Sequence, residues 1–376
     1  MSDPIDDLDR LADELEALNR TVVRTSGGGL EVLLRLMADR EASDLLLLAG
    51  EPPAMRVHGQ IHRMDGPLLD GDDIEQLVLP HLVGHAQRAY RDVGIADASI
   101  RLSGVGRFRV NLHRERARAA AAIRMLPRTV PRLASLDLPP GVEGLTRIGQ
   151  GLVLIGGATG SGKSTTMAAL IEEINRRDAK HIITIEDPIE FEHTNQRSVI
   201  QQIEVGIDAP DFPTALRSAL RQAPDIIVIG EMRDQETMRI ALAAGETGHV
   251  VFSTLHTTDM SSTIARLTDS FPAERQPTIR QEIAAALSAV YVQTLLPRIG
   301  GGRVPAAQLL LVGYGARQHI RRNTLQHLHQ EITISRKHGS FTLEECLARL
   351  VKAGQVERSD AMVRAQHGDD FEHAMR

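Results

Sequence analysis

Gly157-Ala158-Thr159-Gly160-Ser161-Gly162-Lys163-Ser164 is the stretch that decides the fold. It matches the phosphate-binding pattern G-x-x-x-x-G-K-[ST]. A short apolar run from Leu152 to Ile155 precedes it, as expected of a buried parallel strand that ends at a glycine turn. Apolar residues at helical spacing follow it, from Met167 to Ile174. Because both flanks are correct, we reject a chance match in a glycine-rich turn.

Strand, glycine loop and helix in this order direct backbone N–H groups and the positive helix end at a polyphosphate. We therefore expect the eight residues of the motif, followed by Thr165, to bind the phosphates of ATP. Lys163 supplies a point charge, and the Ser164 hydroxyl is the expected ligand of Mg²⁺.

The chain has 376 residues, a length that predicts two or three domains. Its content of 42% hydrophobic residues is that of a globular protein. The sequence shows no membrane span, and its start, Met1 to Pro4, lacks the features of a signal peptide, so a cytoplasmic location is expected. The single cysteine, Cys346, excludes a tetracysteine zinc site. A net charge of -6 and 3% aromatic residues argue against a stable nucleic-acid partner.

Five segments are expected along the chain. Residues 1–28 form an acidic extension with a short amphipathic helix, and residues 29–138 form an α+β domain. The proline-marked residues 139–148 are expected to be a linker. Strands alternate with helices in residues 149–335, which predicts a parallel sheet. Residues 336–376 are a helical tail, and the pattern is mainly helical from about residue 283, with a glycine break at 300–302.

A nucleotide hydrolase also needs a metal-side carboxylate and a residue that activates water. The strand at 226–229 ends in Gly230-Glu231, where ordinary P-loop enzymes carry an Asp, so Glu231 is the expected metal ligand beside Ser164. The strand at 181–185 delivers Glu186, with Glu190 close behind, at the strand end where such sheets bind ligands. Either Glu186 or Glu190 can activate water, and a solvated strand end is the alternative for both.

Two pairs of basic residues leave their roles open. Arg217 and Arg221 lie one turn apart on one helix face, where they either reach a phosphate or form a solvated basic surface. His249 and His256 bracket the strand at 250–252 without a neighbouring cluster of metal ligands. This pattern disfavours a zinc site, and each histidine is either a sensor of the γ-phosphate or a core histidine.

Four motifs in order resemble those of the secretion ATPase superfamily, most closely the PilT-like retraction ATPases of type IV pili. They occupy residues 156–166, 185–191, 225–234 and 247–257, and the resemblance extends from about Leu30 to about Phe371. It implies an α/β fold: a RecA-like P-loop ATPase domain, an N-terminal α+β domain that is PAS-like, and a helical C-terminal tail. It also implies a homohexamer that binds ATP at its interfaces.

The resemblance also implies roles for individual residues. Glu186 is the implied catalytic glutamate, Glu231 the metal-side carboxylate, and His249 and His256 are implied members of the active site. Five arginines are the implied cationic contacts of ATP: Arg107, Arg109, Arg124, Arg217 and Arg221.

The chain departs from the family outside the ATPase motifs. Gln202-Ile203-Glu204 replaces Gln-Arg-Glu, and Ser43 to Leu47 read Ser-Asp-Leu-Leu-Leu in place of Ser-Asp-Leu-His-Leu. The retraction signature Ala-Ile-Arg-x-x-Ile-Arg appears at 315–321 with both arginines and one isoleucine kept. The ATPase motifs are intact, whereas the segment tied to retraction is altered.

The expected function is a hexameric ATP-driven motor for type IV pilus retraction and twitching motility. It is expected to work in the cytoplasm, peripheral to the inner membrane, on a pilus or secretion platform protein. One cysteine cannot build the tetracysteine zinc insert usual in extension-type ATPases, which favours retraction. The alternatives are a DotB-like secretion or conjugation ATPase, and a nucleic-acid translocase, which charge and aromatic content disfavour. A nucleotide-sensing regulator would lack the catalytic carboxylates.

Overall fold

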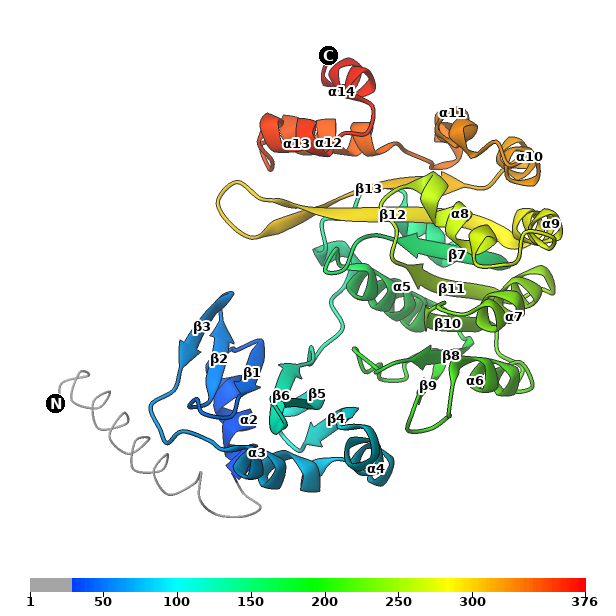
Figure 1. Ribbon diagram of the computed structural model, residues 1–376. Helices are drawn as coiled ribbons and strands as arrows, with labels where there is room; N and C mark the ends of the chain where they lie inside the picture. The colour runs from blue at the N-terminus through cyan, green and yellow to red at the C-terminus, as the bar shows by residue number, and fades with distance from the viewer. Residues whose placement is uncertain (1–28) are drawn as a thin grey trace. The chain divides into compact units, whose positions relative to one another are not determined.

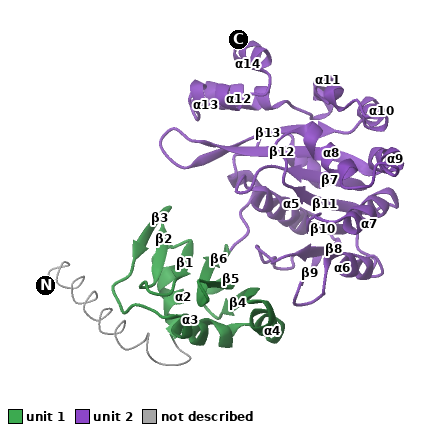
Figure 2. Cartoon of the chain, viewed as in Figure 1, with its two compact units in different colours: residues 1–128 green, residues 129–376 purple. Residues whose placement is uncertain are grey.

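The computed structural model describes residues 29–376, so the helix expected within residues 1–28 lies outside the described residues (Figure 1). The chain divides into two compact units, residues 1–128 and residues 129–376 (Figure 2). Each unit has a sheet and a hydrophobic core of its own.

The first unit is an antiparallel sheet with helices packed on one face. Its strands follow the order β3-β2-β1-β6-β5-β4. The elements are α2 (Gly29–Asp39), β1 (Asp44–Leu47), β2 (Ala54–Val57), β3 (Gln60–Arg63), α3 (Gly71–Val78), η1 (Leu79–His81), α4 (Gly84–Val93), β4 (Ile95–Leu102), β5 (Gly106–Glu115) and β6 (Arg118–Met125). Along β5, Phe108 and Val110 are buried, and they alternate with the arginines Arg107 and Arg109. This period of two separates a core face from a polar face and confirms the expected α+β unit.

The second unit contains a seven-stranded sheet in the order β13-β12-β7-β11-β10-β8-β9. All neighbours from β12 to β9 are parallel, and β13 is antiparallel to β12. The strands are β7 (Gly151–Gly156), β8 (His181–Glu186), β9 (Val199–Glu204), β10 (Ile226–Glu231), β11 (Val250–Leu255), β12 (Leu287–Pro297) and β13 (Arg303–Leu311). The remaining elements before β12 are η2 (Leu133–Ser135), η3 (Val142–Arg147), α5 (Lys163–Arg177), α6 (Phe212–Ala219), α7 (Gln235–Glu246), α8 (Met260–Asp269) and α9 (Gln276–Ala286).

Helices cover both faces of this sheet. On one face Leu170 and Ile174 of α5 pack against Val153 and Val228. On the other face, helices α6 to α9 share a core with residues that alternate with these along the strands, among them Leu154 and Ile227. Burial on both faces explains why the central strands are continuous apolar runs, and the α/β fold class is as expected.

Two expectations about segments are corrected. Residues 139–148 are not a free linker, because η3 buries Val142 and Leu145 in the core beside α5, and the division between the units falls at 128/129. Within the region expected to be mainly helical, residues 287–311 are not helical: β12 and β13 form a long hairpin that turns at Gly300–Gly302. All three of these glycines have positive φ, which explains the glycine run.

The chain ends in helices, as predicted. They are α10 (Tyr314–Arg322), η4 (Leu325–His327), α11 (Leu328–Ile334), η5 (Arg336–His338), α12 (Leu343–Lys352), α13 (Arg358–Arg364) and α14 (Gly368–Met375). The predicted capping box is present, because Thr342 and Glu345 bond reciprocally at the start of α12. From residue 29 onward, no helix combines the length and the apolar character needed to cross a bilayer.

Candidate nucleotide-binding site

The phosphate-binding motif forms the turn between β7 and α5. Lys163 is the first residue of α5, and Ser164 and Thr165 follow in its first turn. The Lys163 Nζ donates to the carbonyl oxygens of Gly157 at 2.8 Å and Ala158 at 2.9 Å. Burial lowers the pKa of the Lys163 ammonium, and the charges of Glu231 and Glu190 oppose that shift. The ammonium thus lies inside the loop, where a phosphate oxygen can replace a carbonyl as its partner.

Glycine is required at two positions of this loop. Gly157 has a φ of 155°, and a Cβ there would lie 2.3 Å from Ser161 Oγ and 2.6 Å from the Gln293 carbonyl oxygen. Gly162 has a φ of 88°, and a Cβ there would lie 2.8 Å from Gln293 Nε2. The buried Ser161 hydroxyl has no hydrogen-bond partner within residues 29–376. A tight loop with an unpaired buried hydroxyl fits a bound phosphate.

Gln293 of β12 holds the phosphate loop in place by hydrogen bonds, and we call this set of contacts the brace. Its Oε1 accepts from the hydroxyls of Thr166 and Tyr291, each at 2.8 Å, and its Nε2 donates to the Ser161 carbonyl at 2.7 Å. Sequence reasoning missed this residue, because Gln293 is 132 positions from Ser161 and belongs to a segment expected to be helical. A lone glutamine in an apolar run was the one available signal.

The loop shares one edge of the sheet with three strand ends, which we call the carboxyl edge. It is formed by the ends of β7, β11, β10 and β8, which are neighbours in this order. These strands end at or next to the phosphate loop, His256, Glu231 and Glu186. Parallel pairing therefore brings together residues that are up to about 100 positions apart.

Glu186 is held at this edge by hydrogen bonds to its carboxylate. Its Oε1 accepts from Thr184 Oγ1 at 2.7 Å and from Gln202 Nε2 at 3.3 Å. Burial raises the pKa of Glu186, and these two hydrogen bonds oppose the rise. Glu190 is exposed in the loop that follows β8.

Glu231 and His256 lie between the phosphate loop and Glu186 along this edge, because β11 and β10 separate β7 from β8. The His256 Nε2 is 3.6 Å from Glu231 Oε2, and its Nδ1 is 3.3 Å from Thr159 Oγ1. Burial lowers the pKa of His256, with a contribution from the Lys163 charge. Glu231 also forms an ion pair with Arg233, whose guanidinium lies 3.7 Å from Asp187. Sequence reasoning did not single out Arg233.

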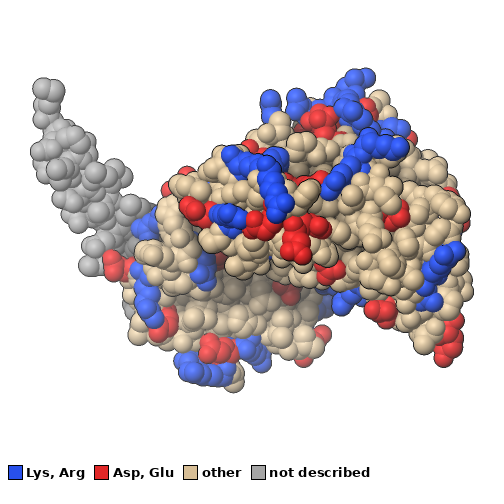
Figure 3. Space-filling model, turned by 90° about the horizontal axis from the view of Figure 1, so that it is seen from above, with Lys and Arg blue, Asp and Glu red and all other residues tan. Residues whose placement is uncertain are grey.

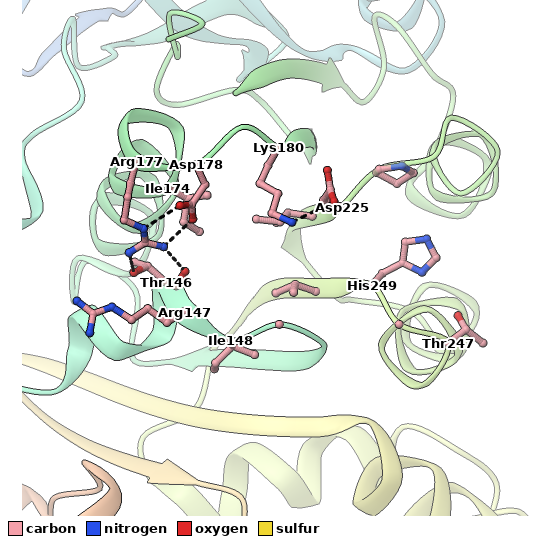
Figure 4. Close-up of a pocket in the computed structure, with 15 residues that line it drawn as sticks. Thr146, Arg147, Ile148, Ile174, Arg177, Asp178, Lys180, Asp225, Thr247 and His249 are labelled. Atoms are coloured by element: carbon pink, nitrogen blue, oxygen red, sulfur yellow. Dashed lines mark hydrogen bonds and ion pairs between the residues drawn. The ribbon is translucent and has the colours of Figure 1, made fainter. Parts of the chain in front are cut away.

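His249 lies at the opposite edge of the sheet. Its carbonyl accepts from the N–H of Gly151, the first residue of β7. It lines a pocket of about 530 Å³ with Arg177 and Lys180, which pair with Asp178 and Asp225 (Figure 4). Six residues of β11 separate His249 from His256, a span of about 20 Å at strand geometry. Within one chain, His256 is the histidine at the phosphate loop, and His249 is not.

The five expected arginines are not gathered at this loop within one unit. Arg217 pairs with Glu236 between α6 and α7, and Arg221 is exposed just after α6. The other three belong to the first unit, on the sheet face opposite its helices: Arg107, Arg109 and Arg124. Arg124 Nε donates to Asp44 at 2.8 Å, and Arg109 lies 3.8 Å from Asp97.

A glycine loop at a helix start, with carboxylates at neighbouring strand ends of a doubly covered parallel sheet, defines a P-loop ATPase. Residues 140–355 match the model of the family described as Type II/IV secretion system protein. This match covers more than half of the chain, which therefore belongs to that family and is a PilT-like secretion ATPase.

Individual relatives agree with this assignment. The chain is 40% identical over 339 residues to the Pseudomonas aeruginosa protein named "Type IV pilus retractation ATPase PilT", covering 90% of this chain and 98% of that one. A crystal structure of the pilus retraction motor PilT with bound ADP superposes with a TM-score of 0.83 at 40% identity, covering 92% of this chain and 98% of that one. The Legionella pneumophila ATPase DotB gives 0.77 at 26% identity, covering 89% and 93%.

Proposed function

We propose that this ATPase is the motor that retracts a type IV pilus and so drives twitching motility. The observation that carries the proposal is the convergence of Glu186 and Glu231 on the loop of Lys163, in a chain similar along its length to a retraction ATPase. The site has the groups that hydrolysis needs, and the similarity indicates the work to which hydrolysis is coupled.

The proposed chemistry gives each group of the site a single role. The loop N–H groups and Lys163 bind the β- and γ-phosphates, and His256 senses the γ-phosphate from the end of β11. Glu186 orients a water and takes its proton as the water oxygen bonds to the γ-phosphorus and the bond to the leaving ADP oxygen breaks. The half-buried carboxylate suits this task, because a raised pKa makes it a stronger base while its hydrogen bonds keep it ionised.

Ser164 and Glu231 would hold Mg²⁺, which would neutralise charge on the phosphates. Among residues 29–376 there is no group of three His, Cys, Asp or Glu side chains arranged for a metal. A site with few protein ligands suits Mg²⁺, which keeps several waters and binds mainly through substrate phosphates. Zinc, in contrast, prefers a closed set of protein ligands.

The complete site is proposed to form only in a homohexamer. Arg107, Arg109 and Arg124 belong to the other compact unit, and Arg217 and Arg221 are exposed on the ATPase unit. We infer that some of these cations reach ATP across a subunit boundary. ATP hydrolysis is then coupled to movement between units, and the ring acts in the cytoplasm on a membrane platform protein.

A second candidate is a secretion or conjugation ATPase like DotB. The similarity to DotB and the altered segment at 315–321 favour it. A nucleic-acid translocase has less support. On the face that Figure 3 shows, basic and acidic side chains are interspersed, and the net charge of the chain is -6.

Gene deletion with complementation tests the proposal. Cells that lack the gene are expected to keep surface pili but lose twitching, because assembled pili are no longer pulled in. Wild-type protein and a Lys337→Ala variant, which changes an exposed lysine far along the chain, should restore movement, whereas Lys163→Ala should not. Loss of surface pili would indicate an extension-type motor, and normal twitching would favour the DotB-like alternative; either result would overturn the retraction role.

A further inference from the structure

The carboxylate of Glu186 receives its two side-chain hydrogen bonds on one oxygen. Thr184 lies two residues earlier on the same strand, and Gln202 lies on the neighbouring edge strand β9. Both donate to Oε1. Two donors on one oxygen, together with a backbone hydrogen bond from Glu190 to the same carboxylate, set its rotation about the last bond and so set where the second oxygen, Oε2, points.

The amide of Gln202 can take only one orientation. Its Oε1 accepts from the His193 N–H at 2.9 Å, and its Nε2 donates to the Phe191 carbonyl at 2.9 Å and to Glu186 at 3.3 Å. If the amide were rotated by 180°, its carbonyl oxygen would face two acceptors, and its NH2 group would face an N–H. The loop that follows Glu186 therefore fixes the amide that holds Glu186.

That loop is itself attached to the helix of the phosphate loop. The buried His193 ring places its Nδ1 3.0 Å from Oε2 of Glu172 on α5, and Gln196 donates to the other oxygen. Asn175, also on α5, donates to the Thr194 carbonyl at 2.9 Å. The contacts form one frame that runs from α5 through the loop to β9 and back to Glu186.

We propose that Gln202 and Thr184 are positioning residues for Glu186, which aim its Oε2 at the attacking water. The inference rests on the proposed role of Glu186 as the base. Neither side chain needs to touch ATP. Gln202 acts from the sheet edge, and its neighbour Gln201 is exposed on the other side of β9, so the two glutamines of one strand have different roles.

The two donors also stabilise the ionised form of Glu186, and so they hold its pKa down against burial. Without them the pKa rises further, and a higher pH is needed to ionise the base. The acid limb of the rate profile therefore moves to higher pH. The other charged groups on the elements around Glu186 are unchanged by the substitutions: Asp187, Glu190, Glu204, Glu231, Arg233 and Lys163.

The test compares the ATPase activity of the full chain and its variants across pH. Gln202→Met and Thr184→Val keep side-chain size and remove the donors. We expect kcat to fall about tenfold in each, as for other residues that orient a reactive group, with the KM for ATP within about twofold. The acid limb should shift to higher pH. Thr184→Ser keeps the hydroxyl and should restore the activity, and Gln201→Met is the matched control.

Glu186→Gln separates the two hypotheses. If Glu186→Gln keeps its turnover, the proposed base is wrong. If Glu186→Gln loses turnover while both donor variants keep kcat and the acid limb of wild type, only the positioning inference is overturned. A melting temperature for each variant reports folding. If Gln202→Met is unstable, the comparison of Thr184→Val with Thr184→Ser tests the positioning inference. Thr184 takes no part in the contacts that join α5, the loop after Glu186 and β9.

Discussion

Replacing Gln293 should destabilise the phosphate loop and weaken its binding of nucleotide. The change Gln293→Met keeps the approximate volume but leaves three groups without their partner: the Ser161 carbonyl and the hydroxyls of Thr166 and Tyr291. The Tyr291 ring is fully buried, so its hydroxyl cannot turn to bulk water. A buried group without a partner costs about 1–3 kcal/mol. The Thr166 hydroxyl can turn to a helix carbonyl, so the two groups that stay unpaired predict a loss of about 2–6 kcal/mol.

The control for this prediction is a variant that removes only one of the three hydrogen bonds. Tyr291→Phe removes one donor and leaves the bonds of Gln293 to Ser161 and Thr166 in place, so it should cost only about 1 kcal/mol. Urea unfolding of the full chain measures the loss of unfolding free energy. The affinity for a fluorescent ATP analogue reports whether the phosphate loop still binds nucleotide. Gln293→Met should weaken binding, whereas Tyr291→Phe should not. If Gln293→Met unfolds like Tyr291→Phe and binds like wild type, the brace is not what holds the loop.

Three further predictions concern the active site and the ring. Lys163→Ala should abolish turnover, whereas Glu186→Gln should still bind nucleotide and lose most hydrolysis; near-normal turnover of Glu186→Gln would transfer the base role to Glu190 or Glu231. Turnover per chain should rise with protein concentration, and mixing Arg217→Ala with Glu186→Gln chains should restore activity, since a mixed interface pairs intact residues. Concentration-independent turnover without rescue contradicts a shared site. Elemental analysis should find no stoichiometric zinc; one zinc per chain contradicts the retraction-type assignment.

The phosphate loop could be predicted because its conformation is local. Gly157 and Gly162 have positive φ and no room for a Cβ, and the helix starts within the motif itself. The carboxylates Glu186 and Glu231 could be predicted for a related reason. Both end apolar strands, and the ends of parallel strands meet at one edge whatever the distance between them in the chain.

Several features could not be predicted from local patterns. A continuous apolar run such as that of β12 fits a buried helix as well as a buried strand, so the hairpin and the brace at Gln293 were hidden. The prolines near residue 139 suggested a linker, but η3 buries Val142 and Leu145. Their contact with α5 is a long-range one, and proline content does not report it.

The sequence by itself determined the chemistry of this protein: the phosphate loop, the strand-end carboxylates and the α/β class all follow from short-range backbone preferences and strand periodicity. Tertiary structure decided which residues share the site. His256 lies at the phosphate loop and His249 at the opposite edge, because one strand separates them. Gln202 holds Glu186, because β9 pairs beside β8. Such neighbours depend on strand order, which packing of the whole chain decides.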